Sequence, residues 1–160
     1  MIILVMGVTG SGKTTVGKAL AKSLHWQFAD ADDFHSPANI SKMRAGIPLD
    51  DADRVPWLAA LRMQIDNWLR AGTNAVLACS ALKHAYREQL VASSEVRVVY
   101  LRGSRELIAK RLKERHGHYM DPNLLPSQFA TLEEPRDALA VDVDASVDEI
   151  VGRIRTVLNL

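Results

Sequence analysis

The sequence has one cysteine, Cys79, among its 160 residues, so an intramolecular disulfide framework is excluded. We therefore expect a protein of the reducing cytoplasm. Long apolar runs are also lacking, and the N-terminal run from Met1 to Met6 is too short for a signal peptide or a membrane span. Charge of one sign is not in excess either, because the sequence has 20 Lys and Arg residues and 19 Asp and Glu residues. This balance excludes a field that would draw the whole molecule to nucleic acid or to an anionic membrane.

The sequence shows no internal repeat, no low-complexity tract and no linker that would divide it. A hydrophobic fraction of 48% is ordinary for a soluble globular domain. A chain of this length can bury roughly 70% of the surface that its unfolded form exposes. We therefore expect one domain over residues 1–160.

Short apolar runs alternate with amphipathic stretches along the chain. The predicted strands are residues 2–6, 26–29, 75–79, 96–101 and 140–143. The predicted helices are residues 13–24, 56–70, 83–91, 104–115 and 147–158, the second of them initiated by Pro56. Such alternation predicts an α/β fold, with a parallel sheet covered by helices on both faces.

Two segments, about 30–54 and about 116–134, lack a clear period. Long segments of this kind inside a compact domain are typical of lids and binding loops. We therefore expect a substrate-binding segment at 30–54 and a lid at 116–134.

The clearest motif lies between the first predicted strand and the first predicted helix. It matches GxxxxGK[ST] without a mismatch, and its residues are Gly7, Val8, Thr9, Gly10, Ser11, Gly12, Lys13 and Thr14. The glycines let successive N–H groups turn inward toward phosphate oxygens, at the positive end of the following helix. We expect Lys13 to reach the β- and γ-phosphates and the Thr14 hydroxyl to bind magnesium. Thr15, in the first turn, either contacts the nucleotide or only begins the helix.

A phosphate loop alone does not distinguish a kinase from a GTPase or an ATP-driven motor. The guanine-reading NKxD motif is absent. The third predicted strand ends Leu77-Ala78-Cys79-Ser80, without the acidic residue that a motor ATPase normally carries there. These two absences favour the kinases of small metabolites and nucleotides.

Asp30, Asp32 and Asp33 follow the second predicted strand, and His35 lies close behind. The carboxyl end of a strand near the phosphate loop is where α/β proteins bind ligands. One carboxylate there can accept the proton of an attacking hydroxyl while another orients magnesium. The alternative is an exposed acidic turn, but clustered carboxylates repel unless a cation joins them. His35 either contacts the substrate or is a hydrogen-bonded structural histidine.

Arginine presents a planar fork suited to carboxylates and phosphates. Arg54 precedes a predicted helix, and two further pairs share helical faces, namely Lys83 with Arg87 and Arg111 with Arg115. Taken singly, each of these side chains is typical of a solvated helix face. Their position at strand ends and beside the expected lid favours anion binding. The basic run 110–118 is also compatible with a nucleic-acid patch, although no stacking aromatics are interleaved with it.

These motifs resemble those of the bacterial-type gluconokinase family, in the same order and over essentially the whole chain. Besides the phosphate loop, the similar segments are 30–35, 39–40, 42–43, 46–49, 53–54, 56–58, 79–83, 86–87, 117–120, 127–129 and 132–133. One departure is Ala31, where many members carry glycine, and it concerns the backbone geometry of the acidic turn.

The resemblance implies ATP-dependent phosphorylation of D-gluconate at its terminal hydroxyl, giving 6-phosphogluconate for the pentose phosphate or related pathways. It also implies a P-loop NTPase fold of the nucleoside-monophosphate-kinase type, a three-layer sandwich with a five-stranded parallel sheet, a mobile lid and a homodimer.

The resemblance also implies roles for individual residues. Lys13 and Thr14 would bind the triphosphate and magnesium, Asp30 would orient the metal, and Asp32 would contact the substrate as the candidate base. The candidates for binding the sugar acid are Arg54, Arg87 and His118, followed by Lys83 and His35. Arg111 would stack on adenine, and Arg115 would meet the transferring phosphate.

Three other functions remain open from the sequence. A kinase of another small hydroxy acid, above all shikimate, uses a similar acidic turn and arginine set. A non-catalytic ATP-binding module would bind ATP and form no ADP. A nucleic-acid 5′-hydroxyl kinase would bind oligonucleotides in a salt-sensitive manner.

Overall fold

The computed structural model of the chain describes residues 1–115 and 122–160. Its sheet contains five parallel strands in the order β2-β3-β1-β4-β5. The strands are β1 (Ile2–Met6), β2 (Gln27–Asp30), β3 (Ala75–Ala78), β4 (Val96–Arg102) and β5 (Leu139–Asp142). Every residue of β1 and β3 is buried, as expected for central strands covered on both faces. The predicted five-stranded parallel α/β fold is confirmed.

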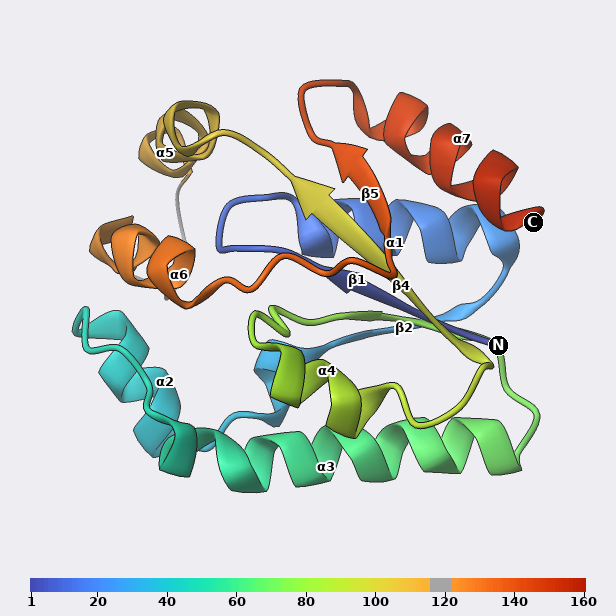
Figure 1. Cartoon of the computed structure of the whole chain (residues 1–160), viewed down its shortest axis with the longest axis horizontal. Helices are drawn as coiled ribbons and strands as arrows, with labels where there is room; N and C mark the ends of the chain where they lie inside the picture. The colour runs from blue at the N-terminus through green and yellow to red at the C-terminus, as the bar shows by residue number, and fades with distance from the viewer. Residues whose placement is uncertain (116–121) are drawn as a thin grey trace.

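Helices cover both faces of the sheet (Figure 1). One layer contains α1 (Lys13–Leu24) and α7 (Val147–Leu158), and the other contains α3 (Asp51–Arg70) and α4 (His84–Leu90). Each helical layer encloses its own apolar core, because alternate residues of the central strands face opposite sides of the sheet. Under α3, Leu4 packs with Trp57 and Leu61. Under α1 and α7, Val5 packs with Leu20 and Ile154.

The remaining elements lie beyond the carboxyl ends of the strands, on the side opposite the two chain termini (Figure 1). They are η1 (Ala31–Phe34), α2 (Pro37–Arg44), α5 (Arg105–Lys113), η2 (Pro122–Leu124) and α6 (Leu125–Thr131). This end of the sheet is where ligands of α/β proteins bind.

The segment 30–54 is more regular than its sequence indicates, since it contains η1, α2 and the first turn of α3. The prediction that Pro56 initiates the second helix is wrong. That helix begins at Asp51, because Asp50 and Asp53 form a capping box: the Asp53 N–H donates to Asp50 Oδ1 at 2.7 Å, and the Asp50 N–H donates to Asp53 Oδ2 at 3.1 Å. Pro56 lies inside the helix, and the Ala52 carbonyl that it leaves without a donor belongs to an exposed residue.

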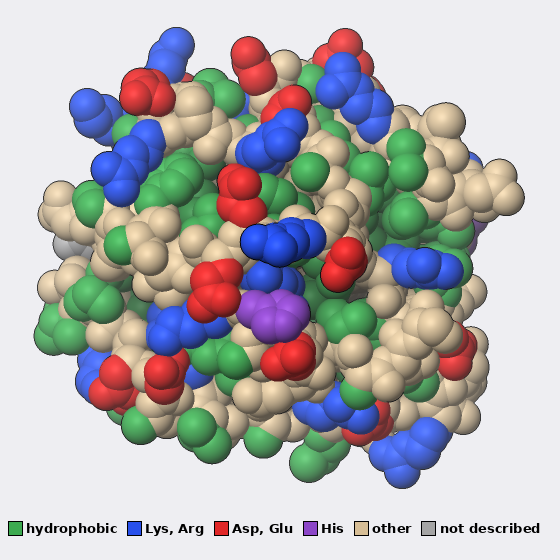
Figure 2. Space-filling view, viewed as in Figure 1, with side chains coloured by type: hydrophobic (Ala, Val, Ile, Leu, Met, Phe, Trp, Pro, Cys, Tyr) green, Lys and Arg blue, Asp and Glu red, His purple; other side chains and the backbone are tan. Residues whose placement is uncertain are grey.

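Of the expected lid at 116–134, residues 116–121 lie outside the described residues, and 122–131 form η2 and α6. Within the described ranges, no helix is both long enough and apolar enough to span a bilayer. On the face shown in Figure 2, acidic and basic side chains are intermixed rather than gathered by sign, in keeping with the net charge of +1.

Candidate active site

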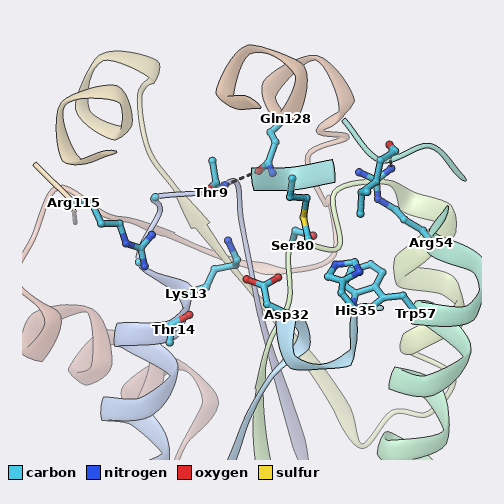
Figure 3. Close-up of a pocket in the computed structure, with 14 residues that line it drawn as sticks. Thr9, Lys13, Thr14, Asp32, His35, Arg54, Trp57, Ser80, Arg115 and Gln128 are labelled. Atoms are coloured by element: carbon cyan, nitrogen blue, oxygen red, sulfur yellow. Dashed lines mark hydrogen bonds between the residues drawn. The ribbon is translucent and has the colours of Figure 1, made fainter. Parts of the chain in front are cut away.

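A cavity opens at the carboxyl ends of β1, β2 and β3 and brings together segments from across the sequence (Figure 3). It is polar on the side of the phosphate loop and partly apolar on the side of α2 and α3. Its lining residues are Thr9, Gly10, Gly12, Lys13, Thr14, Asp32, His35, Met43, Leu49, Arg54, Trp57, Ser80, Arg115 and Gln128.

The phosphate loop forms one wall of this cavity. Gly10 and Gly12 have φ angles of +77° and +95°, a backbone conformation that side chains with a Cβ rarely adopt, and Gly12 caps α1. Lys13 folds back over the loop, where its Nζ donates to the Val8 carbonyl at 2.9 Å. Burial lowers the pKa of Lys13, and the nearby carboxylates of Asp32 and Asp30 oppose that shift. Such a loop, with a cation and a helix N-terminus, is suited to polyphosphate.

The acidic turn lies opposite Lys13, but its three carboxylates point to different places. Asp30 Oδ2 accepts a hydrogen bond from the Thr14 hydroxyl at 2.5 Å, and its Oδ1 accepts from the Asp32 N–H at 3.0 Å. Asp32 extends into the cavity beside Lys13 (Figure 3), whereas Asp33 is exposed and does not line it. The turn needs no glycine at Ala31, which is buried and has no positive φ angle.

The oxygen atoms of Thr14 and Asp30 fit the requirements of magnesium. Mg²⁺ is usually held by one or two protein oxygens together with phosphate oxygens and water. A hydroxyl and a carboxylate in contact at the edge of the phosphate loop supply such a donor pair. In residues 1–115 and 122–160, no cluster of three or more His, Cys, Asp or Glu side chains suitable for a metal occurs.

His35 and Trp57 form a parallel stack on the far side of the cavity, with ring centroids 4.4 Å apart and planes 10° apart. Trp57 Nε1 donates to the Ala31 carbonyl at 2.7 Å, so α3 holds the acidic turn in place. Burial, with a smaller contribution from the Arg54 charge, lowers the pKa of His35 to about 4. At neutral pH the cavity therefore contains an uncharged imidazole at this position.

Arg54 projects into the cavity from the first turn of α3 and is held by two neighbours. Its Nη1 donates to the Leu49 carbonyl at 2.6 Å and lies 3.5 Å from the Tyr86 hydroxyl. Its guanidinium carbon also lies 5.6 Å from the centre of the Tyr86 ring. Lys83 does not line the cavity: its Nζ binds Asp51 Oδ1 at 2.8 Å and lies 5.6 Å from the same ring.

The structure does not bring Arg87 into the cavity. Arg87 is buried, and its Nη1 donates to the carbonyls of Ala81 and Leu82 at 2.9 and 3.0 Å. Ala81 has a φ angle of +42°, which is strained for a residue with a Cβ. The hydrogen bonds of Arg87 therefore stabilise the turn after β3. This turn also contains Ser80, which lines the cavity.

A second cavity adjoins the first on the other side of the phosphate loop. Its lining includes Thr15, Arg111, Ala145 and Val147. Arg111 is oriented by a hydrogen bond from its Nη2 to the Val143 carbonyl at 2.6 Å. Arg115 lines both cavities and so lies at their junction. The candidate His118 lies outside the described residues.

Sequence reasoning gave no role to five side chains that line the first cavity, Met43, Leu49, Trp57, Ser80 and Gln128. All five belong to segments that carry the family resemblance, and that membership is the signal that could have found them. Nothing in their spacing indicates that they converge, because β3, α2, α3 and α6 meet here only through the tertiary fold.

The fold and the cavity define the class, since a parallel sheet in this order with a complete phosphate loop is that of the P-loop kinases. A family model described as an AAA domain matches residues 2–137. A gluconokinase of Gluconobacter oxydans is 50% identical and covers 84% of this chain and 76% of its own length. A probable gluconokinase of Mus musculus is 44% identical and covers 99% and 97%. The chain therefore belongs to the gluconokinase family.

Solved structures agree with this family. A gluconokinase of Sinorhizobium meliloti superposes with a TM-score of 0.83 at 41% identity, covering 98% of this chain and 94% of its own. A shikimate kinase of Bacteroides thetaiotaomicron reaches a TM-score of 0.74 at 18% identity, with 100% and 99% coverage, and so shares the fold alone.

Proposed function

We propose that this protein transfers the γ-phosphoryl group of ATP to the terminal hydroxyl of D-gluconate, giving 6-phospho-D-gluconate. The observation that carries the proposal is the first cavity, in which Lys13, Asp32 and Arg54 converge in a chain of the gluconokinase family. Phosphoryl transfer depends mostly on positioning and charge neutralisation, and the cavity offers groups for both.

On the nucleotide side, N–H groups of the phosphate loop bind the phosphates, except that of Thr9, which is bonded within the protein, and Lys13 neutralises the β- and γ-phosphates. The second cavity takes the nucleoside, with Thr15 at its edge and the Arg111 guanidinium against the base. Arg115, at the junction of the cavities, meets the transferring phosphoryl group. Thr14 and Asp30 would hold Mg²⁺, which supplies positive charge to the phosphates when bound.

On the acceptor side, Asp32 accepts the proton of the attacking hydroxyl. Arg54 binds the gluconate carboxylate, because a guanidinium pairs with a carboxylate through two parallel hydrogen bonds. His35, neutral at physiological pH, exchanges hydrogen bonds with the sugar hydroxyls. Segment 30–54 thus binds the substrate, and segment 116–134, which contains His118, closes over it to exclude water.

Arg87 and Lys83, which the sequence predicted to bind the substrate, have a structural role in this proposal. The Arg87 hydrogen bonds to Ala81 and Leu82 and the Lys83 contact with Asp51 favour roles in shaping the walls of the cavity rather than in direct contact with gluconate.

The decisive experiment is an ADP-release assay of the purified protein with ATP and Mg²⁺, offering gluconate, other sugar acids, shikimate and no acceptor. ADP formation with gluconate far above the acceptor-free rate is the expected result. A preference for shikimate would overturn the acceptor assignment, and ATP binding without ADP release on any acceptor would indicate a non-catalytic module. Salt-sensitive oligonucleotide binding would point to the nucleic-acid kinase instead.

The variant Asp32→Asn separates chemistry from nucleotide binding. Loss of a positioned base is expected to lower kcat by about 10² to 10⁴-fold. The Kd for a non-hydrolysable ATP analogue should change little, because the loop that binds the phosphates is intact. Near-native turnover would show that Asp32 is not the base.

We further propose that the protein is a cytoplasmic homodimer and that its product feeds the pentose phosphate pathway. Sedimentation of the purified protein tests the dimer.

A further inference from the structure

A hydrogen bond joins the phosphate loop to a helix 119 residues away in sequence. The Thr9 N–H, buried in the third position of the loop, donates to Gln128 Oε1 at 2.6 Å (Figure 3). A backbone N–H can only donate, so the atom that faces it must be the amide oxygen of Gln128. The contact therefore also fixes which way round the side-chain amide lies, with Gln128 in the lining of the first cavity.

The helix that carries Gln128, α6, packs against the apolar core beside the phosphate loop. On α6, Leu125 is buried in an apolar cluster with Val8 and Leu112, and Phe129 packs against the same cluster. The chain leaving α6 is tied to the turn after β3, since the Glu133 N–H donates to the Leu82 carbonyl at 2.8 Å. In this arrangement of the expected lid segment, Gln128 therefore faces Thr9 from a helix that packs against the phosphate-loop side of the core.

The same short segment also contacts the acceptor side of the cavity. Leu124, just before α6, is buried in a cluster with Met43 and Leu49. Both of these residues line the first cavity within the segment 30–54. Residues 124–128 therefore contact the proposed acceptor wall through Leu124 and the phosphate loop through Gln128.

We infer that Gln128 is a positioning residue for phosphoryl transfer, which holds the Thr9 N–H and so fixes the phosphate loop relative to the acceptor wall. The inference rests on the proposed function, since it concerns the alignment of the γ-phosphoryl group with the acceptor hydroxyl. Transfer requires the attacking and leaving oxygens to lie in line, and small displacements of bound groups are costly in rate. The residue acts through the loop and leaves the affinity for gluconate largely to Arg54.

The test is Gln128→Met, which keeps the length of the side chain and removes its acceptor oxygen. The matched control is Ser127→Ala on the same helix, whose hydroxyl donates to the Leu124 carbonyl at 2.8 Å. Gln128→Met is expected to lower kcat about tenfold or more. The KM for gluconate should stay within threefold of native. Because the buried Thr9 N–H loses its acceptor, the rates are compared at a temperature at which every variant is folded. Ser127→Ala should retain native kcat. Native kcat in Gln128→Met, or an equal loss in both variants, would overturn the inference.

Amide hydrogen exchange at Thr9 provides a readout that does not depend on the acceptor. In Gln128→Met the Thr9 N–H is expected to exchange faster than in the native protein, with neighbouring strand amides unchanged. If the native protein fails to phosphorylate gluconate while Thr9 exchange still accelerates, the proposed function fails and the loop contact stands. Unchanged Thr9 exchange would refute the contact itself.

Discussion

The Thr14 hydroxyl donates a hydrogen bond to the Asp30 carboxylate across 2.5 Å, joining the first turn of α1 to the end of β2. The two residues are 16 positions apart, and the sheet order places β2 at the edge, with β3 between it and β1. The pair therefore lies where the phosphate loop meets the acidic turn, and it links nucleotide binding to the position of Asp32.

The first prediction concerns Asp30→Asn. The amide oxygen can still accept from the Asp32 N–H, and the Thr14 hydroxyl can turn to accept from the amide NH₂, so the acidic turn should keep its shape. The negative charge that would attract Mg²⁺ is lost. We expect the Mg²⁺ concentration for half-maximal activity to rise about tenfold or more. The measurement is a Mg²⁺ titration of the initial rate, with Asp33→Asn, at an exposed residue of the same turn, as the control. Equal Mg²⁺ curves for the native protein and Asp30→Asn would contradict the metal assignment.

The second prediction separates the two arginines that sequence reasoning treated alike. Arg54→Met removes a guanidinium from the cavity and should raise the KM for gluconate about 10- to 100-fold. Arg87→Met instead leaves two buried carbonyls without their donor, so we expect the free energy of unfolding to fall by about 1–3 kcal/mol. Steady-state kinetics and urea unfolding of both variants provide the measurement. A larger rise in KM for Arg87→Met than for Arg54→Met would reverse the assignment.

Much of the fold could be predicted from the sequence because its signals are local. The all-buried run of β1, the glycine spacing of the phosphate loop and the apolar face of α1 each depend on neighbouring residues. The order of the strands and their register depend on pairing between residues far apart in sequence, so no local pattern predicts them. The resemblance implied only that the sheet has five parallel strands.

The segment 30–54 shows why α2 and the start of α3 could not be predicted from the sequence. Its eight-residue helix α2 is too short for a hydrophobic period to emerge, and the start of α3 depends on a reciprocal bond between Asp50 and Asp53 that Pro56 obscures. Arg87 shows the complementary error. Its spacing from Lys83 indicated a shared helical face, but only the tertiary fold turns its guanidinium onto the carbonyls of Ala81 and Leu82.

The third prediction tests the capping of α3, which sets the position of Arg54. Asp50→Ala removes the acceptor for the Asp53 N–H and should lower the free energy of unfolding by about 1 kcal/mol. Asp50→Ser restores an N-cap oxygen and should recover most of that loss. Urea unfolding of the two variants measures the difference. If both variants lose the same stability, the charge of Asp50 rather than its hydrogen bond matters.

The last prediction follows from the uncharged state of His35. Burial lowers the pKa of His35 to about 4 in the folded protein, against 6.5 for an ordinary histidine. As the pH falls from 6.5 toward 4, the unfolded chain takes up a proton at this residue that the folded protein does not. Because the unfolded state then binds more protons, stability should fall with pH across that window and change no further through His35 below about pH 4.

His35→Gln removes this titration, so we expect a flatter dependence of unfolding free energy on pH between 6.5 and 4 than in the native protein. His84→Gln, at an exposed histidine on α4, is the matched control for the His→Gln substitution itself. Urea unfolding at half-unit intervals of pH gives both slopes. Identical slopes for the native protein and His35→Gln would mean that His35 accepts a proton in the folded state as readily as in the unfolded chain. The stack on Trp57 would then accommodate an imidazolium, and the proposed hydrogen bonding of a neutral His35 to the sugar would have to be abandoned.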